Sequence, residues 1–92
     1  MVKDDFLKIL WSYPMYSTIK RKKLDGYFEV LKEDALRGDA FATYASYIVN
    51  IVCYRNDFSI TIEQMDEIIS GYNYPRVHAE RLSYELRELL DL

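Results

Sequence analysis

The apolar residues between Asp39 and Val52 constrain the fold more than any other feature of this chain. They recur with the i, i+3, i+4, i+7 spacing of one helix face: Phe41, Tyr44, Ala45, Ile48, Ile51 and Val52. The Asp39 carboxylate can cap the amino end of this helix. Val49 and Cys53 widen its apolar side, so we expect a central helix that neighbours cover on more than one face.

The rest of the chain also favours helices, because no stretch alternates long enough to predict a strand with confidence. We expect a first helix from Lys3 to Ser12, and a second that Ser17 or Thr18 caps. The second helix either ends near Gly26 or continues through it with a bend. Past Gly26 the helical spacing of apolar residues continues until Arg37-Gly38, where we expect a helix to end. A capping-box pattern predicts a short helix from Thr61 to Ile69, and Pro75 opens the last helix. The prediction is a single all-α domain over residues 1–92, a compact bundle of about five or six helices.

Composition agrees with a globular protein, since 50% of the residues are hydrophobic and 29% are charged. The single cysteine, Cys53, lies in an apolar run and cannot form an internal disulfide, so we expect a buried thiol. No apolar stretch approaches the roughly 20 residues that span a bilayer, and no secretory signal is recognisable. We therefore expect a cytoplasmic protein without a membrane partner.

Charge is distributed unevenly along the chain. Residues 1–23 carry six basic and two acidic groups, whereas residues 57–92 carry three basic and eight acidic groups. An acidic half steers a basic protein partner towards it and disfavours non-specific binding to nucleic acid. The charge pattern thus favours a protein partner.

Nine tyrosines in 92 residues point to contact surfaces, because a tyrosine offers a stiff apolar ring with a polar tip. Three of them lie at or beside the expected core faces, where a tyrosine is more often a packing residue than a binding hot spot: Tyr27, Tyr44 and Tyr84. Four others lie off the main apolar faces or in the turn before the last helix, and we expect them to contact a partner: Tyr47, Tyr54, Tyr72 and Tyr74. Tyr47 and Tyr54 share one stripe of the central helix, which could be exposed.

The residue types of common catalytic and metal sites do not combine here. A Cys53–His78 nucleophile pair is disfavoured because the thiol lies on an apolar helix face. His78 is the only histidine in the sequence, so a zinc or iron site that needs two histidines is not expected. The acidic cluster Glu63, Asp66 and Glu67 lacks the ligand spacing of a calcium loop, and no glycine-rich phosphate motif is present. We expect no catalytic residue, cofactor, metal or small-molecule substrate.

The basic run from Lys20 to Lys23 is the segment best suited to bind phosphate. Consecutive residues of a helix point in different directions, and the rest of the chain is acidic, so a solvated helix end is the favoured interpretation. The alternative is a small phage- or mobile-element-encoded regulator that binds nucleic acid, or a host nucleic-acid machine, through this run.

The middle of the chain resembles Maf-type and contact-dependent-inhibition immunity proteins, which bind and silence a cognate bacterial toxin. The resemblance covers about a third of the chain and is carried by Arg37-Gly38-Asp39, Tyr44, Ile48, Val52, Ile60-Thr61-Ile62 and Ile68-Ile69. Separately, Tyr72-Asn73-Tyr74-Pro75 is similar to the Tyr-Tyr-Pro element with which colicin-nuclease immunity proteins grip their toxins. This chain departs from that family by the intervening Asn73 and by its N-terminal pattern.

The resemblance implies a non-enzymatic inhibitor that binds a basic toxin domain, a nuclease in the favoured case, as a monomer or homodimer. Tyr54, Tyr72 and Tyr74 would anchor the toxin. Carboxylates of the C-terminal half would steer the encounter: Glu63, Asp66, Glu67 and Glu80. A third interpretation is a homodimeric scaffold that buries Tyr47 and Tyr54 across a two-fold axis.

Overall fold

Helices account for nearly all of the chain that the structure describes. The computed structural model describes residues 2–55 and 76–92. Its elements in order are α1 (Val2–Trp11), the 3-10 turn η1 (Tyr13–Met15), α2 (Thr18–Leu36), α3 (Ala40–Val49), the π turn η2 (Asn50–Tyr54) and α5 (Arg76–Leu90). No strand occurs within those two ranges, so the predicted all-α class is confirmed. The helix predicted from Thr61 to Ile69 lies outside them, and the total of about five or six helices stays a prediction.

The predicted helix boundaries rest on short-range polar contacts. Ser17 caps α2, because its Oγ accepts a hydrogen bond from the Lys20 N–H at 3.3 Å. Asp39 caps α3 in the same way, with its Oδ1 accepting from the Ala42 N–H at 2.7 Å. Between the two helices Gly38 has a φ of 90°, a left-handed conformation that glycine adopts with little strain. Both predicted caps and the predicted stop at Gly38 are confirmed.

Gly26 does not interrupt α2, which decides between the two alternatives left open by the sequence. The helix runs without a break from Thr18 to Leu36. A glycine inside a helix costs roughly 0.5–1 kcal/mol relative to alanine. Packing of the flanking turns, with Leu24 and Leu31 buried, holds the helix together across this position.

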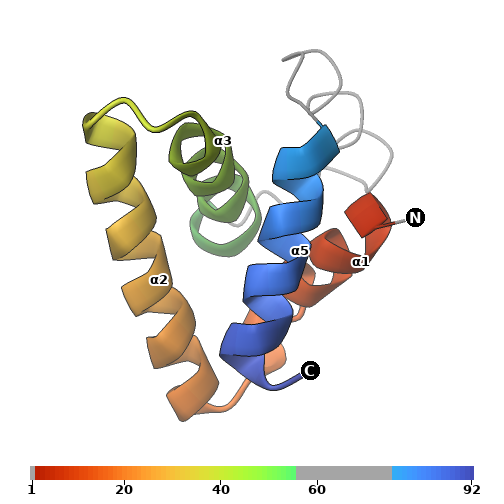
Figure 1. The fold of residues 1–92 in the computed structure, drawn as a ribbon. Coiled ribbons are helices and arrows are strands. Elements are labelled where there is room, and N and C mark those ends of the chain that lie inside the picture. The colour runs from red at the N-terminus through yellow and green to blue at the C-terminus, as the bar shows by residue number, and fades with distance from the viewer. Residues whose placement is uncertain (1, 56–75) are drawn as a thin grey trace.

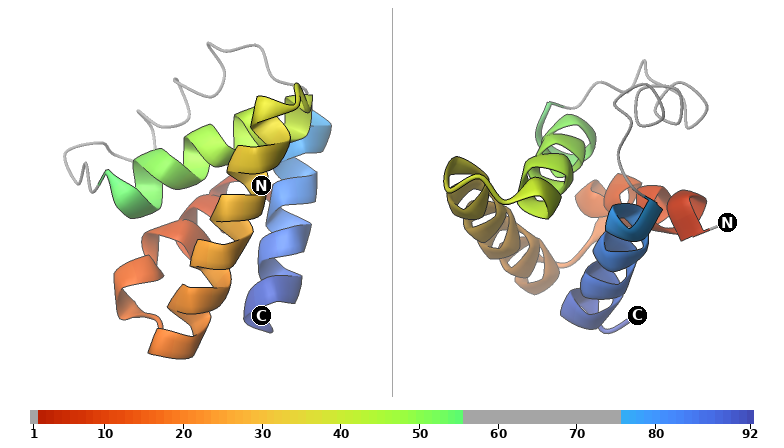
Figure 2. Two further views of the ribbon diagram at one scale, coloured as in Figure 1. Left: turned by 90° about the vertical axis from the view of Figure 1, so that its left-hand side faces the viewer. Right: turned by 45° about the horizontal axis from the view of Figure 1, so that its top comes forward.

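The helices pack in two pairs around a shared core. α2 lies chiefly against α3, and α5 lies chiefly against α1, while α3 also touches α5 (Figures 1 and 2). η2 continues α3 and packs against α1. α3 therefore has neighbours on more than one side, as its wide apolar face predicted. None of the helices in the described ranges is long and apolar enough to span a bilayer.

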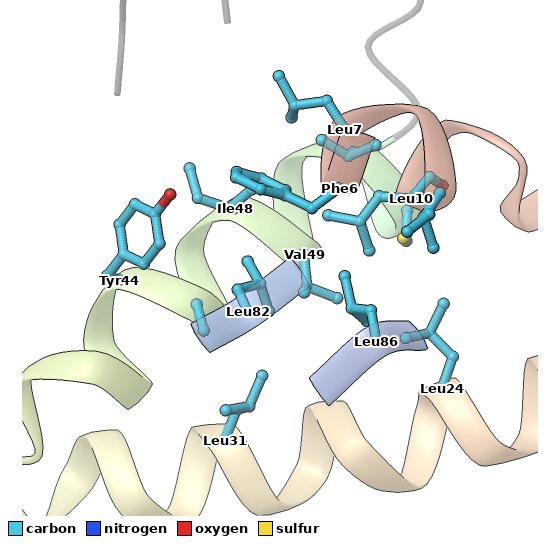
Figure 3. Close-up of a cluster of buried hydrophobic side chains, with 14 of the residues drawn as sticks. Phe6, Leu7, Leu10, Leu24, Leu31, Tyr44, Ile48, Val49, Leu82 and Leu86 are labelled. Atoms are coloured by element: carbon cyan, nitrogen blue, oxygen red, sulfur yellow. The ribbon is translucent and has the colours of Figure 1, made fainter. Parts of the chain in front are cut away.

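Each of the α-helices in the described ranges contributes side chains to one hydrophobic cluster (Figure 3). Its members include Phe6, Leu7, Leu10, Leu24, Leu31, Tyr44, Ile48, Val49, Leu82 and Leu86. Fully burying one such side chain stabilises the fold by about 1.5–3 kcal/mol before the entropic cost of ordering it. The cluster fixes the positions of the helices, and hence of the polar groups and surfaces around them.

The central helix departs from its predicted form at its carboxyl end. α-helical geometry ends at Val49, and the next five residues form a π turn that closes with a 2.8 Å hydrogen bond from the Arg55 N–H to the Asn50 carbonyl. Within this turn three consecutive residues are buried: Ile51, Val52 and Cys53. The spacing predicted the buried positions correctly but not the wider turn.

Candidate functional site

Two tyrosines from different elements donate hydrogen bonds to one carboxylate oxygen. Tyr13 of η1 donates to Oδ1 of Asp25 on α2 at 2.8 Å, and Tyr54 of η2 donates to the same atom at 2.5 Å. The Tyr13 and Tyr54 rings contact each other with centroids 5.5 Å apart. This cluster ties three elements together at one point, so its tyrosines have a structural role.

Burial and the Asp25 carboxylate both act on these phenols. The pKa values of Tyr13 and Tyr54 are raised above the ordinary value for tyrosine. The main cause is desolvation by burial, and the second is the hydrogen bond to Asp25. Both hydroxyls thus stay protonated at neutral pH and act as hydrogen-bond donors. They are unsuited to general-base chemistry there.

A shallow, open groove lies beside this cluster, between α2 and the α3–η2 segment. Its volume is about 370 Å³, and it is lined by Phe28, Lys32, Ser46, Tyr47 and Asn50. The Phe28 ring stacks on Tyr54 with centroids 4.6 Å apart, and the Lys32 Nζ lies 4.7 Å from the Phe28 centroid. Aromatic and cationic groups therefore meet at this surface.

The sequence predicted a stripe of Tyr47 and Tyr54 that could be exposed, and the structure places the two rings differently. Both are half-buried against the core. Tyr47 lines the groove, whereas Tyr54 lies behind it, with one face on Phe28 and its hydroxyl bonded to Asp25. Their predicted role in partner binding stays a prediction, and in the free chain Tyr54 already has an internal structural role.

A second tyrosine–carboxylate contact joins α2 to α5. The Tyr27 hydroxyl donates to Oε2 of Glu85 at 2.7 Å, and Arg81 forms an i, i+4 ion pair with Glu85 at 3.5 Å. Burial, followed by the bond to Glu85, raises the pKa of Tyr27. The Arg81 guanidinium also lies 3.9 Å from the Phe41 ring centroid. The predicted packing role of Tyr27 is confirmed.

The outward face of α5 carries an exposed tyrosine and corrects one prediction. Tyr84 was expected at or beside the core, but 66% of its surface is exposed. Val77, two helical turns earlier on the same face, is 61% exposed. Glu80 and Glu88 lie exposed on either side of Tyr84, one turn before and after it. We call Val77, Glu80, Tyr84 and Glu88 the α5 outer face.

The signal that Tyr84 faces outward was present in the sequence. It lies two residues from Leu82 and two from Leu86, and two residues of an α-helix span about 200°, so it sits opposite the buried stripe. Leu82 and Leu86 are both fully buried, which fixes that orientation. The expectation that Tyr84 packs at or beside the core is therefore wrong.

The predicted partner-binding residues are only partly described. Glu80 is exposed and forms an ion pair with Arg76, with its Oε1 3.1 Å from the Arg76 Nε. Five others lie outside the described residues: Glu63, Asp66, Glu67, Tyr72 and Tyr74. Tyr72 and Tyr74 precede α5 in the sequence, and their predicted role in partner binding stays a prediction.

The described residues provide little for nucleophilic or metal chemistry. Cys53 is buried, its Sγ lies 3.6 Å from the Leu10 carbonyl oxygen, and burial raises the pKa of its thiol to about 12. His78 is half-buried beside the rings of Phe41 and Tyr44. Within residues 2–55 and 76–92, no group of histidine, cysteine and carboxylate side chains is placed to hold a metal ion.

Comparison with protein-family models, with curated proteins and with solved structures gave no match for this chain. The fold and the exposed surfaces are therefore the basis for assigning a function. They describe an all-α protein whose described tyrosines mostly bind its own helices together, with one exposed tyrosine on an outward helix face.

Proposed function

We propose that this chain is a non-enzymatic, stoichiometric inhibitor, an immunity protein that neutralises a basic bacterial toxin domain such as a nuclease. The observation that carries the proposal is the α5 outer face. There Tyr84 combines a large exposed ring with carboxylates one turn away on each side, Glu80 and Glu88. Tyrosine rings are frequent anchors of protein interfaces, and carboxylates steer a cationic partner.

Tyr84 is suited to anchor a partner because its hydroxyl makes no hydrogen bond with another described residue. By contrast, Tyr13, Tyr16, Tyr27 and Tyr54 each donate to a protein oxygen at 2.8, 2.7, 2.7 and 2.5 Å. A partner that accepts from the Tyr84 hydroxyl therefore breaks no contact within the fold. The bound surface would extend from α5 into the preceding segment, where Tyr72 and Tyr74 supply further anchors.

The carboxylates of the C-terminal half give the proposed inhibitor its preference for a basic partner. Glu80 and Glu88 are exposed on α5, and the sequence adds the cluster Glu63, Asp66 and Glu67. Such groups speed association mainly through long-range attraction, which salt screens. In the proposed inhibitor, an all-α bundle of about five or six helices, these carboxylates act in binding, and no residue has a catalytic role.

The test is affinity capture with the full chain from the source cells, with the bound proteins identified by mass spectrometry. A basic protein recovered in stoichiometric amount is the expected result. We then expect Tyr84→Ala to weaken its binding about tenfold to a hundredfold, as interface tyrosines do, with folding unchanged. Glu80→Gln with Glu88→Gln should slow association and flatten its salt dependence.

Leu36→Ala is the matched control, since Leu36 is 90% exposed on α2, away from the α5 outer face. It should leave the affinity unchanged. Equal losses for Leu36→Ala and Tyr84→Ala would contradict the assignment of this face. Capture of nucleic acid without a protein partner would instead support the alternative, a small regulator that binds nucleic acid. In that case neutralising Lys20 to Lys23 should abolish the capture.

A further inference from the structure

One end of the molecule exposes large apolar side chains beside a concentration of positive charge. η1, the start of α2 and the last turn of α5 gather at this end, away from the α2–α3 turn (Figures 1 and 2). Met15 of η1 is 87% exposed and Ile19 of α2 is 71% exposed. An ion pair at 4.0 Å between Lys23 of α2 and Asp91 shows that α2 and the end of α5 meet here. We call this region the basic end.

The cations of the basic end surround the apolar residues. Lys22 and Lys23 are exposed and follow Ile19 by three and four positions, which places all three on one face of α2. Lys20 extends over the Tyr16 ring, with its Nζ 5.8 Å from the centroid. The exposed Ile19 side chain thus shares one face of α2 with two exposed lysines, of which Lys23 pairs with Asp91.

We propose that the basic end binds the surface of anionic phospholipid membranes. Lysines attract the negatively charged head groups, and exposed aliphatic side chains gain free energy by entering the boundary between head groups and acyl chains. Met15 and Ile19 supply those side chains, while Lys20, Lys22 and Lys23 supply the charges. The contact is interfacial and requires no spanning helix.

The shape and chemistry of the basic end favour lipid over the other anionic partners. Met15 and Ile19 are both largely exposed, and a deformable lipid surface can cover such protruding groups without a matching groove. Nucleic acid binding would gain nothing from them, since single strands are held by stacking on aromatic faces. The ring of Tyr16, which Lys20 covers, is half-buried, and its hydroxyl donates to the Ile9 carbonyl at 2.7 Å.

This inference is independent of the proposed inhibitor function, because it uses the opposite charge and different residues. It departs from the expectation that the chain has no membrane partner. That expectation rested on the absence of a spanning segment and of a secretory signal, and neither bears on binding at the interface. A membrane-bound chain would still present the α5 outer face to a protein.

The test is flotation of the full chain with vesicles of phosphatidylcholine alone and of phosphatidylcholine mixed with phosphatidylserine. We expect binding to the mixed vesicles and little to the neutral ones. The pair Met15→Ser and Ile19→Ser should lower the bound fraction roughly tenfold by removing the inserting groups. The pair Lys22→Gln and Lys23→Gln should lower it by at least as much, since each lysine near an anionic surface contributes about fivefold.

Leu36→Ser is the matched control for the apolar pair, because Leu36 is equally exposed but lies at the other end of α2. It should leave vesicle binding unchanged. Failure to bind mixed vesicles would overturn the proposal, as would an equal loss in the control. Binding to an oligonucleotide that depends on the lysines but is unaffected by Met15→Ser and Ile19→Ser would assign the basic end to nucleic acid instead.

Discussion

The tyrosines around α2 and the tyrosine on the outer face of α5 differ in what their hydroxyls bind. Tyr13 and Tyr54 donate to Asp25, and Tyr27 donates to Glu85, so these phenols connect separate elements of the fold across 12, 29 and 58 positions of the sequence. Tyr84 instead directs its ring into solvent. The residue type is the same in both regions. Its position relative to the buried face of the helix decides whether a tyrosine bonds to another helix or faces solvent.

The substitution Tyr54→Ala tests the structural role of the internally bonded tyrosines most strongly. The substitution removes a ring that stacks on Phe28 and a hydroxyl that donates to Asp25. We expect the free energy of unfolding to fall by about 2–3 kcal/mol, somewhat less than for a fully buried aromatic residue. Urea denaturation with linear extrapolation measures the change.

Tyr84→Ala is the control for this prediction. It replaces a ring of the same size on the outward side of α5, where no other described residue accepts a hydrogen bond from it. The free energy of unfolding should change by less than about 0.5 kcal/mol, as for most exposed substitutions. Similar costs for Tyr54→Ala and Tyr84→Ala would show that the two regions do not differ as the structure indicates.

Alkaline pH should weaken the ties selectively. Burial and neighbouring carboxylates raise the pKa of Tyr13, Tyr27 and Tyr54 in the folded chain above 10.0, the ordinary value expected in the unfolded chain. The unfolded state therefore releases protons first, so the contribution of these tyrosines is complete below pH 10 and is lost as the pH rises above it. The loss is at most about 1.4 kcal/mol per pH unit for each tyrosine, and partial exposure to solvent reduces it.

The substitution Tyr54→Phe isolates the contribution of one tyrosine hydroxyl to this pH dependence. The variant lacks one ionisable hydroxyl but keeps the ring on Phe28, so it should be about 1 kcal/mol less stable than the natural chain at neutral pH. Above pH 10 the gap should narrow, because only the natural chain must keep Tyr54 protonated to remain folded. Unfolding curves of both chains at several pH values measure the gap, and a constant gap would contradict the raised pKa.

Most of the described fold could be predicted because its signals are local. Capping by Ser17 and Asp39, the stop at Gly38 and the buried stripe of α5 each depend on residues within one or two turns. The π turn at Asn50–Tyr54 could not be predicted, because its apolar residues fit a regular helix equally well. Packing against α1 and α2, which a local pattern does not contain, accompanies that wider turn.

The candidate surfaces were harder to predict, since they depend on which residues meet across the fold. No spacing in the sequence indicates that Asp25 accepts from both Tyr13 and Tyr54, because those contacts span 12 and 29 positions. Tyr84 is different: its orientation follows from the positions of Leu82 and Leu86 alone. Helix geometry, applied to every tyrosine in turn, would have assigned it to the surface.

A further modest effect is expected at Gly26, which lies between Asp25 and Tyr27, the two α2 residues that form the tyrosine–carboxylate hydrogen bonds. A Cβ added to Gly26 would meet nothing within 4 Å, so Gly26→Ala should stabilise the chain by about 0.5–1 kcal/mol. Gly38→Ala is the matched contrast, because the φ of 90° there strains any residue with a Cβ and should cost about 1 kcal/mol.

Thermal unfolding of both glycine variants distinguishes two roles for Gly26. If this glycine only weakens the helix, Gly26→Ala raises the melting temperature and leaves the alkaline sensitivity of the tyrosines unchanged. If its conformational freedom lets α2 reach both Tyr54 and Glu85, the variant is less stable, and the tyrosines ionise at lower pH. α2 is continuously helical through Gly26, and this geometry favours the first outcome. The hydrogen bonds of Asp25 and Tyr27 then depend on a rigid helix, which alanine would strengthen.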